Sequence, residues 1–268
     1  MARRPSQRER ILALLRGAED YVSSQAICKE LKITRAAVWK QIQGLRNQGY
    51  SIQGVSSRGY RLREVPDALH VLEADPGIRT DRIGGTILVK DVTESTNDDL
   101  WELGRQGAEE GTVVIAEMQR AGKGRRGRQW VSPANRNLYM SVLLRPPFPP
   151  ADAAMVTLMA GVVLCEALKE VFPLRPEIKW PNDLLLEGRK AAGILAEMEA
   201  EQESIHFLIL GIGVNLNMSR EMFPEDLRYP ATSVQLALGR PVERVPFVRC
   251  LLERLDRGYQ QLLLDRGA

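Results

Sequence analysis

The residues best suited to chemistry form one short run, Ala121-Gly122-Lys123-Gly124-Arg125-Arg126-Gly127-Arg128-Gln129-Trp130. It lies between two apolar, strand-like segments, 112–117 and 138–144. Its three glycines alternate with four cations, and backbone N–H groups and guanidinium groups bind phosphate and carboxylate well. A solvated basic hairpin loop and a nucleic-acid contact have a similar composition. The run therefore predicts an anion-binding loop whose ligand depends on the rest of the chain.

Three other stretches carry polar or glycine residues where strands end. Ser95, Thr96 and Asn97 follow the strand-like segment 86–92, and hydroxyl residues there are more often helix caps than ligand contacts. Lys179 stands in a strand-like run over 177–186, where a lysine is either paired or only an edge residue that reaches solvent. The sequence Gly211-Ile212-Gly213-Val214-Asn215 ends another strand, and its glycines either admit a ligand or mark a bulge.

Several classes of site are excluded by composition. Only His70 and His206 are present, without cysteines at metal-ligand spacing, so neither a zinc site nor a histidine-based triad is expected, and no metal ligands are assigned. The three cysteines are far apart and odd in number, which indicates a reduced, cytoplasmic protein. No apolar run suggests a signal peptide or a membrane span, so no membrane association is expected.

Charge divides the chain into two parts. Residues 1–63 hold 13 basic and 4 acidic side chains, a net charge of +9, whereas the whole chain is +3, so the remainder carries −6. A proline- and glycine-containing stretch follows the basic part. We predict that residues 1–63 form a domain that binds a polyanion. Residues 64–80 are predicted to be a linker, and residues 81–268 a second domain.

The basic part has the pattern of a winged helix-turn-helix. Helices are predicted over 7–16, from the N-cap Ser23 through 31, and from the N-cap Thr34 to about Gly49, with a wing at 55–58. In this geometry the third helix enters the DNA major groove, although such modules also dock proteins. The residues expected to contact DNA are Arg35, Ala36, Trp39, Lys40, Gln43 and Arg58.

The second part alternates between strand and helix patterns. Strands are predicted at 86–92, 112–117, 138–144, 177–186, 191–199 and 205–210. Helices are predicted from Thr96 or Asn97 to Gly107, from the N-cap Asp152 to about Lys169, over 232–238 and over 246–264. The fold class is therefore α+β, with a winged helix-turn-helix in front of a mixed sheet.

Four motifs, Ser95-Thr96-Asn97, Gly122–Trp130, Lys179-Trp180-Pro181-Asn182-Asp183 and Gly211–Asn215, occur in the order and approximate spacing of biotin–protein ligases. With the winged helix in front, nearly the whole chain resembles the bifunctional type, which is both biotin ligase and biotin-operon repressor. The resemblance implies a biotin/lipoate ligase-like catalytic domain related to class II synthetases.

The resemblance also assigns roles to matching residues. It implies biotin contacts at Ser95, Thr96, Asn97, Gln119, Lys123, Gly124, Arg125, Lys179, Gly211 and Gly213. It implies contacts to ATP or the adenylate at Arg125, Arg128, Trp130, Lys179, Asn215 and Phe223. Lys179 and Arg125 would be the catalytic cations, and Phe223 would lie in a loop that covers the adenine.

The implied reaction uses biotin as substrate and ATP with Mg²⁺. It forms biotinyl-5′-adenylate and then transfers biotin to a lysine of a biotin carboxyl carrier protein domain. The adenylate would also act as corepressor by favouring a homodimer that binds operator DNA. The operator sequence, the carrier and the dimer interface are not encoded in any recognisable pattern.

Two departures from the family pattern leave alternatives open. Lys123 stands where arginine is commoner, and no small SH3-like C-terminal domain is found before Ala268. The alternatives are a biotin-sensing repressor with impaired ligation, a lipoate- or octanoyl-transferring relative, and a DNA-binding regulator with another small ligand.

Overall fold

The computed structural model describes residues 7–18, 20–47, 50–64, 67–75, 77–225, 227 and 229–266. The predicted end of the third helix at Gly49 and the linker residues Pro66 and Pro76 lie outside this part. The chain divides into two compact units, Met1–Arg79 and Thr80–Ala268, so the division falls inside the segment expected to be a linker.

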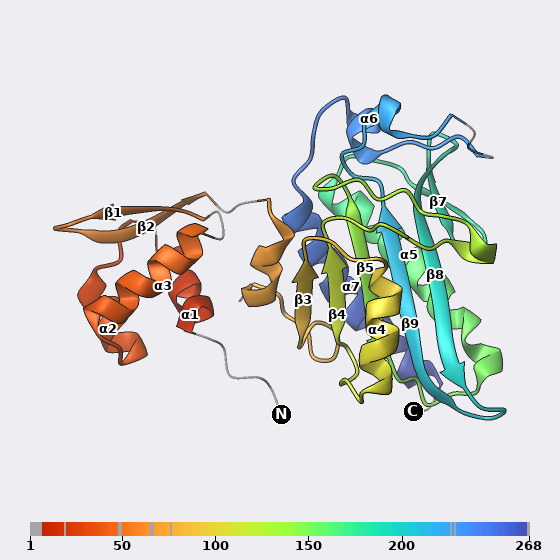
Figure 1. Cartoon of the computed structure of the whole chain (residues 1–268), viewed down its shortest axis with the longest axis horizontal. Helices are drawn as coiled ribbons and strands as arrows, with labels where there is room; N and C mark the ends of the chain where they lie inside the picture. The colour runs from red at the N-terminus through yellow and green to blue at the C-terminus, as the bar shows by residue number, and fades with distance from the viewer. Residues whose placement is uncertain are drawn as a thin grey trace. The chain divides into compact units, whose positions relative to one another are not determined.

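The first unit contains three helices and a two-stranded hairpin (Figure 1). Its elements are α1 (Gln7–Arg16), α2 (Ser24–Leu31), α3 (Arg35–Asn47), β1 (Ser51–Val55), β2 (Gly59–Glu64) and a 3-10 helix over Leu69–Ala74. Both predicted caps are confirmed, since the side chains of Ser23 and Thr34 accept hydrogen bonds from Ala26 N (3.1 Å) and Ala37 N (3.2 Å). These caps fix where α2 and α3 begin.

The buried faces of the three helices form the core of this unit. Ile11 and Leu12 from α1, Ile27 from α2, and Val38 and Ile42 from α3 are fully buried. Val38 and Ile42 are four positions apart and therefore lie on the same face of α3. The opposite face of α3 is exposed to solvent. Burial of these side chains therefore fixes which face of α3 is exposed.

The second unit is built on one seven-stranded sheet in the order β3-β4-β5-β9-β8-β7-β6 (Figure 1). All neighbouring strands are antiparallel except β3 and β4, which are parallel. The strands are β3 (Ile87–Lys90), β4 (Val113–Ala116), β5 (Leu138–Leu144), β6 (Glu177–Lys179), β7 (Asp183–Leu186), β8 (Arg189–Ala200) and β9 (Ile205–Val214). The predicted mixed sheet is confirmed.

Helices cover both faces of this sheet. Figure 1 shows α4 (Thr96–Arg105) in front of it and α5 (Ala154–Val171) and α7 (Arg244–Asp265) behind it. Leu100 of α4 packs into a buried cluster with Val114, Leu143, Phe207 and Ile209 from three strands. This packing holds the first turn of α4 against the centre of the sheet. The remaining elements are α6 (Val234–Leu238) and 3-10 turns at Arg125–Gly127, Pro150–Asp152 and Arg220–Met222.

Three local predictions are wrong. The run 177–186 is not one strand, because a turn at 180–182 divides it into the antiparallel pair β6 and β7. Asp152 does not cap α5, since it belongs to the preceding 3-10 turn and Ala153 is the N-cap without a side-chain bond. The N-cap of α4 is Ser95, rather than Thr96 or Asn97, and its side chain makes no capping bond.

Contrary to the expectation that no apolar run suggests a membrane span, one helical segment is as long and apolar as such a span. This segment is Pro150–Val171, with a mean hydropathy of 1.7. In the fold α5 packs against α7 and against strands β6 to β8, and Val156, Ala160 and Leu164 are fully buried. Its hydrophobicity is therefore accounted for by two packed faces within the domain.

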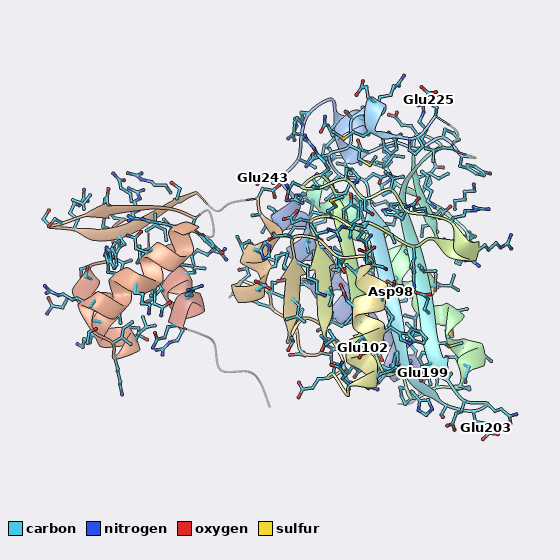
Figure 2. The ribbon with its side chains drawn as sticks, viewed as in Figure 1. Asp98, Glu102, Glu199, Glu203, Glu225 and Glu243 are labelled. Atoms are coloured by element: carbon cyan, nitrogen blue, oxygen red, sulfur yellow. The ribbon has the colours of Figure 1, made fainter. Side chains whose placement is uncertain are left out.

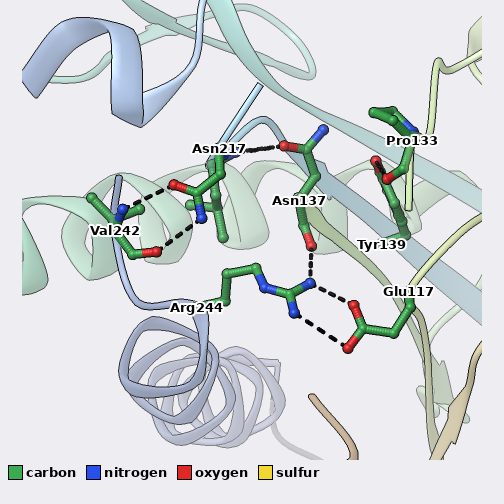
Figure 3. A network of polar contacts seen from close by, with 8 residues as sticks. Glu117, Pro133, Asn137, Tyr139, Asn217, Val242 and Arg244 are labelled. Carbon is green, nitrogen blue, oxygen red and sulfur yellow. Dashed lines mark hydrogen bonds and ion pairs between the residues drawn. The ribbon is translucent and has the colours of Figure 1, made fainter. Parts of the chain in front are cut away.

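A buried ion pair joins the end of β4 to the start of α7 (Figure 3). Arg244 Nη1 lies 2.6 Å from Glu117 Oε2 and also donates to the carbonyl of Asn137 at 3.3 Å. Arg244 and Glu117 are 4% and 5% exposed. The Asn137 side chain accepts from the backbone N–H of Leu216 at 2.9 Å, so the network also reaches the segment after β9. It fixes the point where β4 leads into the basic loop.

Candidate functional site

Two adjoining cavities lie where the basic loop meets the sheet. The smaller, of about 50 Å³, is lined by the first turn of α4, by the loop and by the inner strands β5, β8 and β9. Every residue predicted to contact biotin lines it except Lys179: Ser95, Thr96, Asn97, Gln119, Lys123, Gly124, Arg125, Gly211 and Gly213. Segments more than a hundred residues apart in the chain therefore converge on one small polar cavity.

The larger cavity, of about 380 Å³, is lined by the loop, by the turn between β6 and β7 and by the segment that follows β9. Every residue predicted to contact ATP lines it except Lys179: Arg125, Arg128, Trp130, Asn215 and Phe223. Gly124, Arg125, Trp130, Asn182 and Lys190 line both cavities, so a ligand that occupies one is within reach of the other. The basic loop thus forms the shared wall between them.

The loop is held as a hairpin by its own backbone. Gly124 N donates to Arg128 O at 2.7 Å, and Trp130 N donates to Gly122 O at 2.7 Å. A Cβ on Gly122 would lie 2.5 Å from the Trp130 carbonyl oxygen, so this closure requires glycine there. Arg125 Nη1 donates to Asn182 Oδ1 at 2.8 Å, which ties the loop to the turn between β6 and β7.

Lys123 is paired with Asp98 of α4, whose place at the upper end of that helix is marked in Figure 2. The hydrogen bond to Asp98 raises the pKa of the Lys123 ammonium, against a smaller opposing effect of burial. Glu197 adds to the negative field around it. The ammonium that was predicted to bind an anionic ligand therefore lies at the edge of the smaller cavity with a carboxylate partner.

The glycines of the Gly211–Asn215 motif make room for side chains of the protein itself. A Cβ on Gly211 would clash with Oδ1 of Asn97, and one on Gly213 would lie 2.6 Å from Cε2 of the Trp130 ring. Both glycines also line the smaller cavity. The sequence suggested close approach of a ligand or a bulge. In the structure these two glycines leave the space that the side chains of Asn97 and Trp130 occupy.

Lys190 is a site residue that sequence reasoning missed. It lines both cavities, its Nζ lies 2.7 Å from Asp183 Oδ1, and the same Nζ lies 5.3 Å from the centre of the Trp130 ring. In the sequence it belongs to an apparent turn, 188–190. No sequence pattern marked it, because the strand register places Lys190 opposite Leu185, and its partners Asp183 and Trp130 are not its neighbours in the chain.

Lys179 points elsewhere. Its Nζ lies 2.7 Å from the centre of the Tyr229 ring, and Lys179 lines neither cavity, although Tyr229 lines the larger one. A cation over an aromatic face is stabilised there by the ring quadrupole. Between the two lysines, the geometry favours Lys190 as the cation that faces a ligand.

Comparison with known proteins identifies the family. Residues 89–215 match the model of the biotin/lipoate A/B protein ligase family, and residues 7–61 match a helix-turn-helix domain. The chain is 36% identical over 244 residues to the bifunctional ligase/repressor BirA of Bacillus subtilis, covering 91% of this chain and 75% of the relative. The chain belongs to the biotin/lipoate A/B protein ligase family.

Other relatives agree with this assignment. The bifunctional ligase/repressor BirA of Escherichia coli is 38% identical over 212 residues, which cover 79% of this chain and 64% of that protein. The biotin protein ligase from Aquifex aeolicus, solved in complex with biotin and ATP, superposes with a TM-score of 0.56 and 28% identity. The superposition covers 66% of this chain and 71% of that one.

The two histidines lie at other places in the chain. His206 Nε2 lies 3.3 Å from Glu201 Oε1 at the turn between β8 and β9, and His70 Nδ1 lies 3.6 Å from Glu73 Oε2 in the first unit. Neither lines the two cavities. Among the described residues, no group of three His, Cys, Asp or Glu side chains is placed to hold a metal ion.

The helix-turn-helix of the ligase presents the predicted DNA-contacting side chains on the outer face of α3. Arg35, Ala36, Trp39 and Lys40 are exposed and Gln43 is half-buried. Trp39 is 58% exposed, which is unusual for a tryptophan without a partner surface. In the turn between β1 and β2, Arg58 pairs with Asp20, and its guanidinium carbon lies 4.5 Å from the centre of the Tyr21 ring.

Proposed function

We propose that this chain is an ATP-dependent biotin–protein ligase whose first domain binds operator DNA and represses transcription. The observation that carries the proposal is the pair of adjoining cavities joined by one basic loop. Apart from Lys179, the predicted biotin residues line the smaller cavity and the predicted ATP residues line the larger one. The names of the relatives, bifunctional ligase/repressor and biotin protein ligase, support the same activity.

In the first step the biotin carboxylate attacks the α-phosphate of ATP, and pyrophosphate leaves. Arg125 and Lys190 line both cavities, so we place the reacting carboxylate and phosphate between them. Negative charge builds up on phosphate oxygens during this step, and cations fixed in advance stabilise it. The protein's task is positioning and electrostatic stabilisation, which does not require a histidine base.

The Mg²⁺ that accompanies ATP fits this site without a dedicated protein cage. Magnesium is usually held by substrate phosphates, waters and one or two carboxylates, and it neutralises charge on the phosphates. Asp183 is the carboxylate among the residues that line the larger cavity, and it is paired with Lys190. We propose that the Asp183 carboxylate would hold the metal that comes with the nucleotide, which would supply positive charge to the phosphates.

In the second step a lysine amine of a biotin carboxyl carrier protein attacks the mixed anhydride, which releases AMP. Enclosing the adenylate under the loop would protect it from water until the carrier binds. We further propose that the adenylate acts as corepressor by favouring a homodimer that binds operator DNA. We propose that the protein acts in the reduced cytoplasm, where it would encounter both the carrier and the operator.

Pyrophosphate release tests the first step. The full chain is mixed with ATP and Mg²⁺, with either biotin or lipoate as the acid, and pyrophosphate is measured. Release that requires biotin supports the ligase. Release with lipoate alone would place the chain with the lipoate-activating branch of the family, and no release with either acid would contradict the proposal.

Phe223 is expected to cover the adenine of ATP. It lines the larger cavity and is half-buried. Stacking of a base on an aromatic ring contributes about 1–3 kcal/mol, so Phe223→Ala should weaken ATP binding about 5- to 150-fold. Calorimetric titration of ATP into the biotin-free protein measures this affinity, because no adenylate can form without biotin. Unchanged ATP affinity, with the melting temperature preserved, would show that Phe223 is not part of the adenine site.

The exposed face of α3 is expected to bind DNA. Trp39→Ala should weaken operator binding by about 1–3 kcal/mol and leave the fold intact, because the side chain contributes little to the core. Fluorescence anisotropy at fixed salt measures the affinity.

For the charge contribution, Lys40→Ala is compared with Lys169→Ala, the same change on the exposed surface of α5. Equal effects of the two lysine variants would argue against α3 as the DNA-binding surface.

A further inference from the structure

The segment that precedes α2 is fixed against the β1–β2 hairpin, the wing of the helix-turn-helix. Val22 and Tyr60 exchange two backbone hydrogen bonds, with N···O distances of 2.8 and 2.9 Å. Gly59, at a φ of 106°, permits this contact, because a Cβ there would lie 2.1 Å from the carbonyl oxygen of Val22. The Ser23 cap of α2 follows directly. The segment is therefore attached to both the hairpin and the helix, and this places Asp20 beside the wing.

The Asp20 carboxylate is shared by two arginines of the wing. Its Oδ2 accepts a hydrogen bond from Arg58 Nη2, and its Oδ1 lies 3.6 Å from Arg61 Nη1. The Tyr21 ring beneath the Arg58 guanidinium adds a second contact, with the guanidinium carbon 4.5 Å from the ring centre. Guanidinium groups that converge on one anion have the arrangement with which arginines bind a phosphate. The carboxylate thus lies where the wing would offer its donors to a phosphate.

This arrangement is open to solvent. The side chains of Asp20 and Arg58 are 58% and 55% exposed, and that of Arg61 is 35% exposed. Ion pairs this exposed contribute little to stability, so the fold does not depend on them. Their main effect falls on the charge that the wing presents, because the carboxylate compensates part of the positive charge of the two arginines.

Binding to DNA of arbitrary sequence depends on such charges. Protein cations that neutralise phosphates release counterions, and this release supplies essentially all of non-specific binding. An arginine that keeps a carboxylate partner neutralises a phosphate less completely, and it must give up that partner to form a close pair. Residues 1–63 carry 13 basic and only 4 acidic side chains, so an acidic residue on the wing opposes the charge of its own domain.

We propose that Asp20 is an intramolecular counter-ion that limits binding to non-specific DNA. It engages Arg58 and Arg61 in place of backbone phosphates and so lowers the affinity for arbitrary sequence, which competes with an operator at very many sites in a genome. The inference rests on the proposed function, because it presupposes that the first domain binds DNA.

The test measures binding of the full chain, without biotin, to a fluorescein-labelled duplex of random sequence by fluorescence anisotropy at several salt concentrations. Asp20→Asn removes the charge and keeps the shape of the side chain. Glu30→Gln is the matched control, because it removes one negative charge from the same domain. Glu30 is an exposed residue of α2, and its ion-pair partner is Arg10 of α1, 3.9 Å away, rather than an arginine of the wing.

Asp20→Asn is expected to lower the dissociation constant at low salt by at least about threefold. It should also steepen the dependence of log Kd on log salt by about 0.9 for each arginine that gains a phosphate. Glu30→Gln should change the affinity less than about twofold, because its charge acts only through screened solvent. In the Arg58→Gln/Arg61→Gln background, Asp20→Asn should leave the salt slope unchanged, because its effect passes through these two arginines.

Three results would overturn the inference and leave DNA binding intact. The first is wild-type affinity and slope in Asp20→Asn. The second is weaker binding in that variant, which would assign Asp20 to positioning the arginines for DNA. The third is an equal gain in Glu30→Gln, which would assign the effect to net charge. If Asp20→Asn does not fold, Asp20→Ser must meet the same expectations. Failure of the wild-type protein to bind the duplex at any salt concentration would instead overturn the proposed DNA-binding function, and the inference with it.

Discussion

Replacing Lys190 by glutamine is expected to slow adenylate formation about 10²- to 10³-fold, the usual effect of removing one group that stabilises transition-state charge. Lys190 lines both cavities, and glutamine keeps much of its length without its charge. Because the lost interaction strengthens as charge builds up on phosphate, the effect should fall mainly on kcat. Biotin-dependent pyrophosphate release measures it.

Lys179→Gln is the matched control, and it separates two assignments of the catalytic cation. The family motif predicts Lys179, whereas the geometry favours Lys190, since Lys179 lies against the Tyr229 ring. We expect Lys179→Gln to change the rate less than about tenfold. A large loss in Lys179→Gln together with a small one in Lys190→Gln would restore the assignment made from the sequence.

Replacing Arg244 by methionine is expected to lower the free energy of unfolding by about 3–5 kcal/mol, because it removes the buried guanidinium that compensates the charge of the Glu117 carboxylate. The pair is nearly inaccessible to water and joins β4 to α7 (Figure 3). Urea denaturation followed by tryptophan fluorescence measures the change.

The double variant Glu117→Leu/Arg244→Met tests the cause of that loss. Replacing both charged groups by apolar ones also removes the buried charge of Glu117, so the double variant should recover much of the stability that the single variant lost. A single variant that loses less than about 1 kcal/mol, or a double variant no more stable than the single one, would contradict this account of the pair.

Much of the fold follows from local patterns in the sequence. The capping residues Ser23 and Thr34 and the apolar period of α3 mark the helix-turn-helix. The apolar run 138–144 is found as β5 with the same bounds. The turn at 180–182 was missed because apolar residues on either side of it continue the strand pattern. The cap of α5 was missed because a 3-10 turn precedes the helix.

The candidate site is predicted best where a motif is contiguous. The smaller cavity gathers Ser95, Thr96 and Asn97 with the basic loop, as the motifs suggested. What the sequence does not reveal depends on contacts between distant segments. Glu197 meets Asn97 a hundred positions away, and Arg244 meets Glu117 across 127 positions. Neither the periodicity nor the spacing of residues predicts which charged side chains form a buried pair with a residue far away in the chain.

The central claim is that this chain activates biotin and passes it to a carrier lysine. The most direct test is to incubate the full chain with biotin, ATP, Mg²⁺ and a purified biotin carboxyl carrier domain, and to measure the intact mass of that domain. The account predicts a gain equal to one biotinyl group, which is lost when the acceptor lysine of the carrier is replaced. A carrier of unchanged mass, under conditions where an established biotin ligase modifies it, would contradict the account.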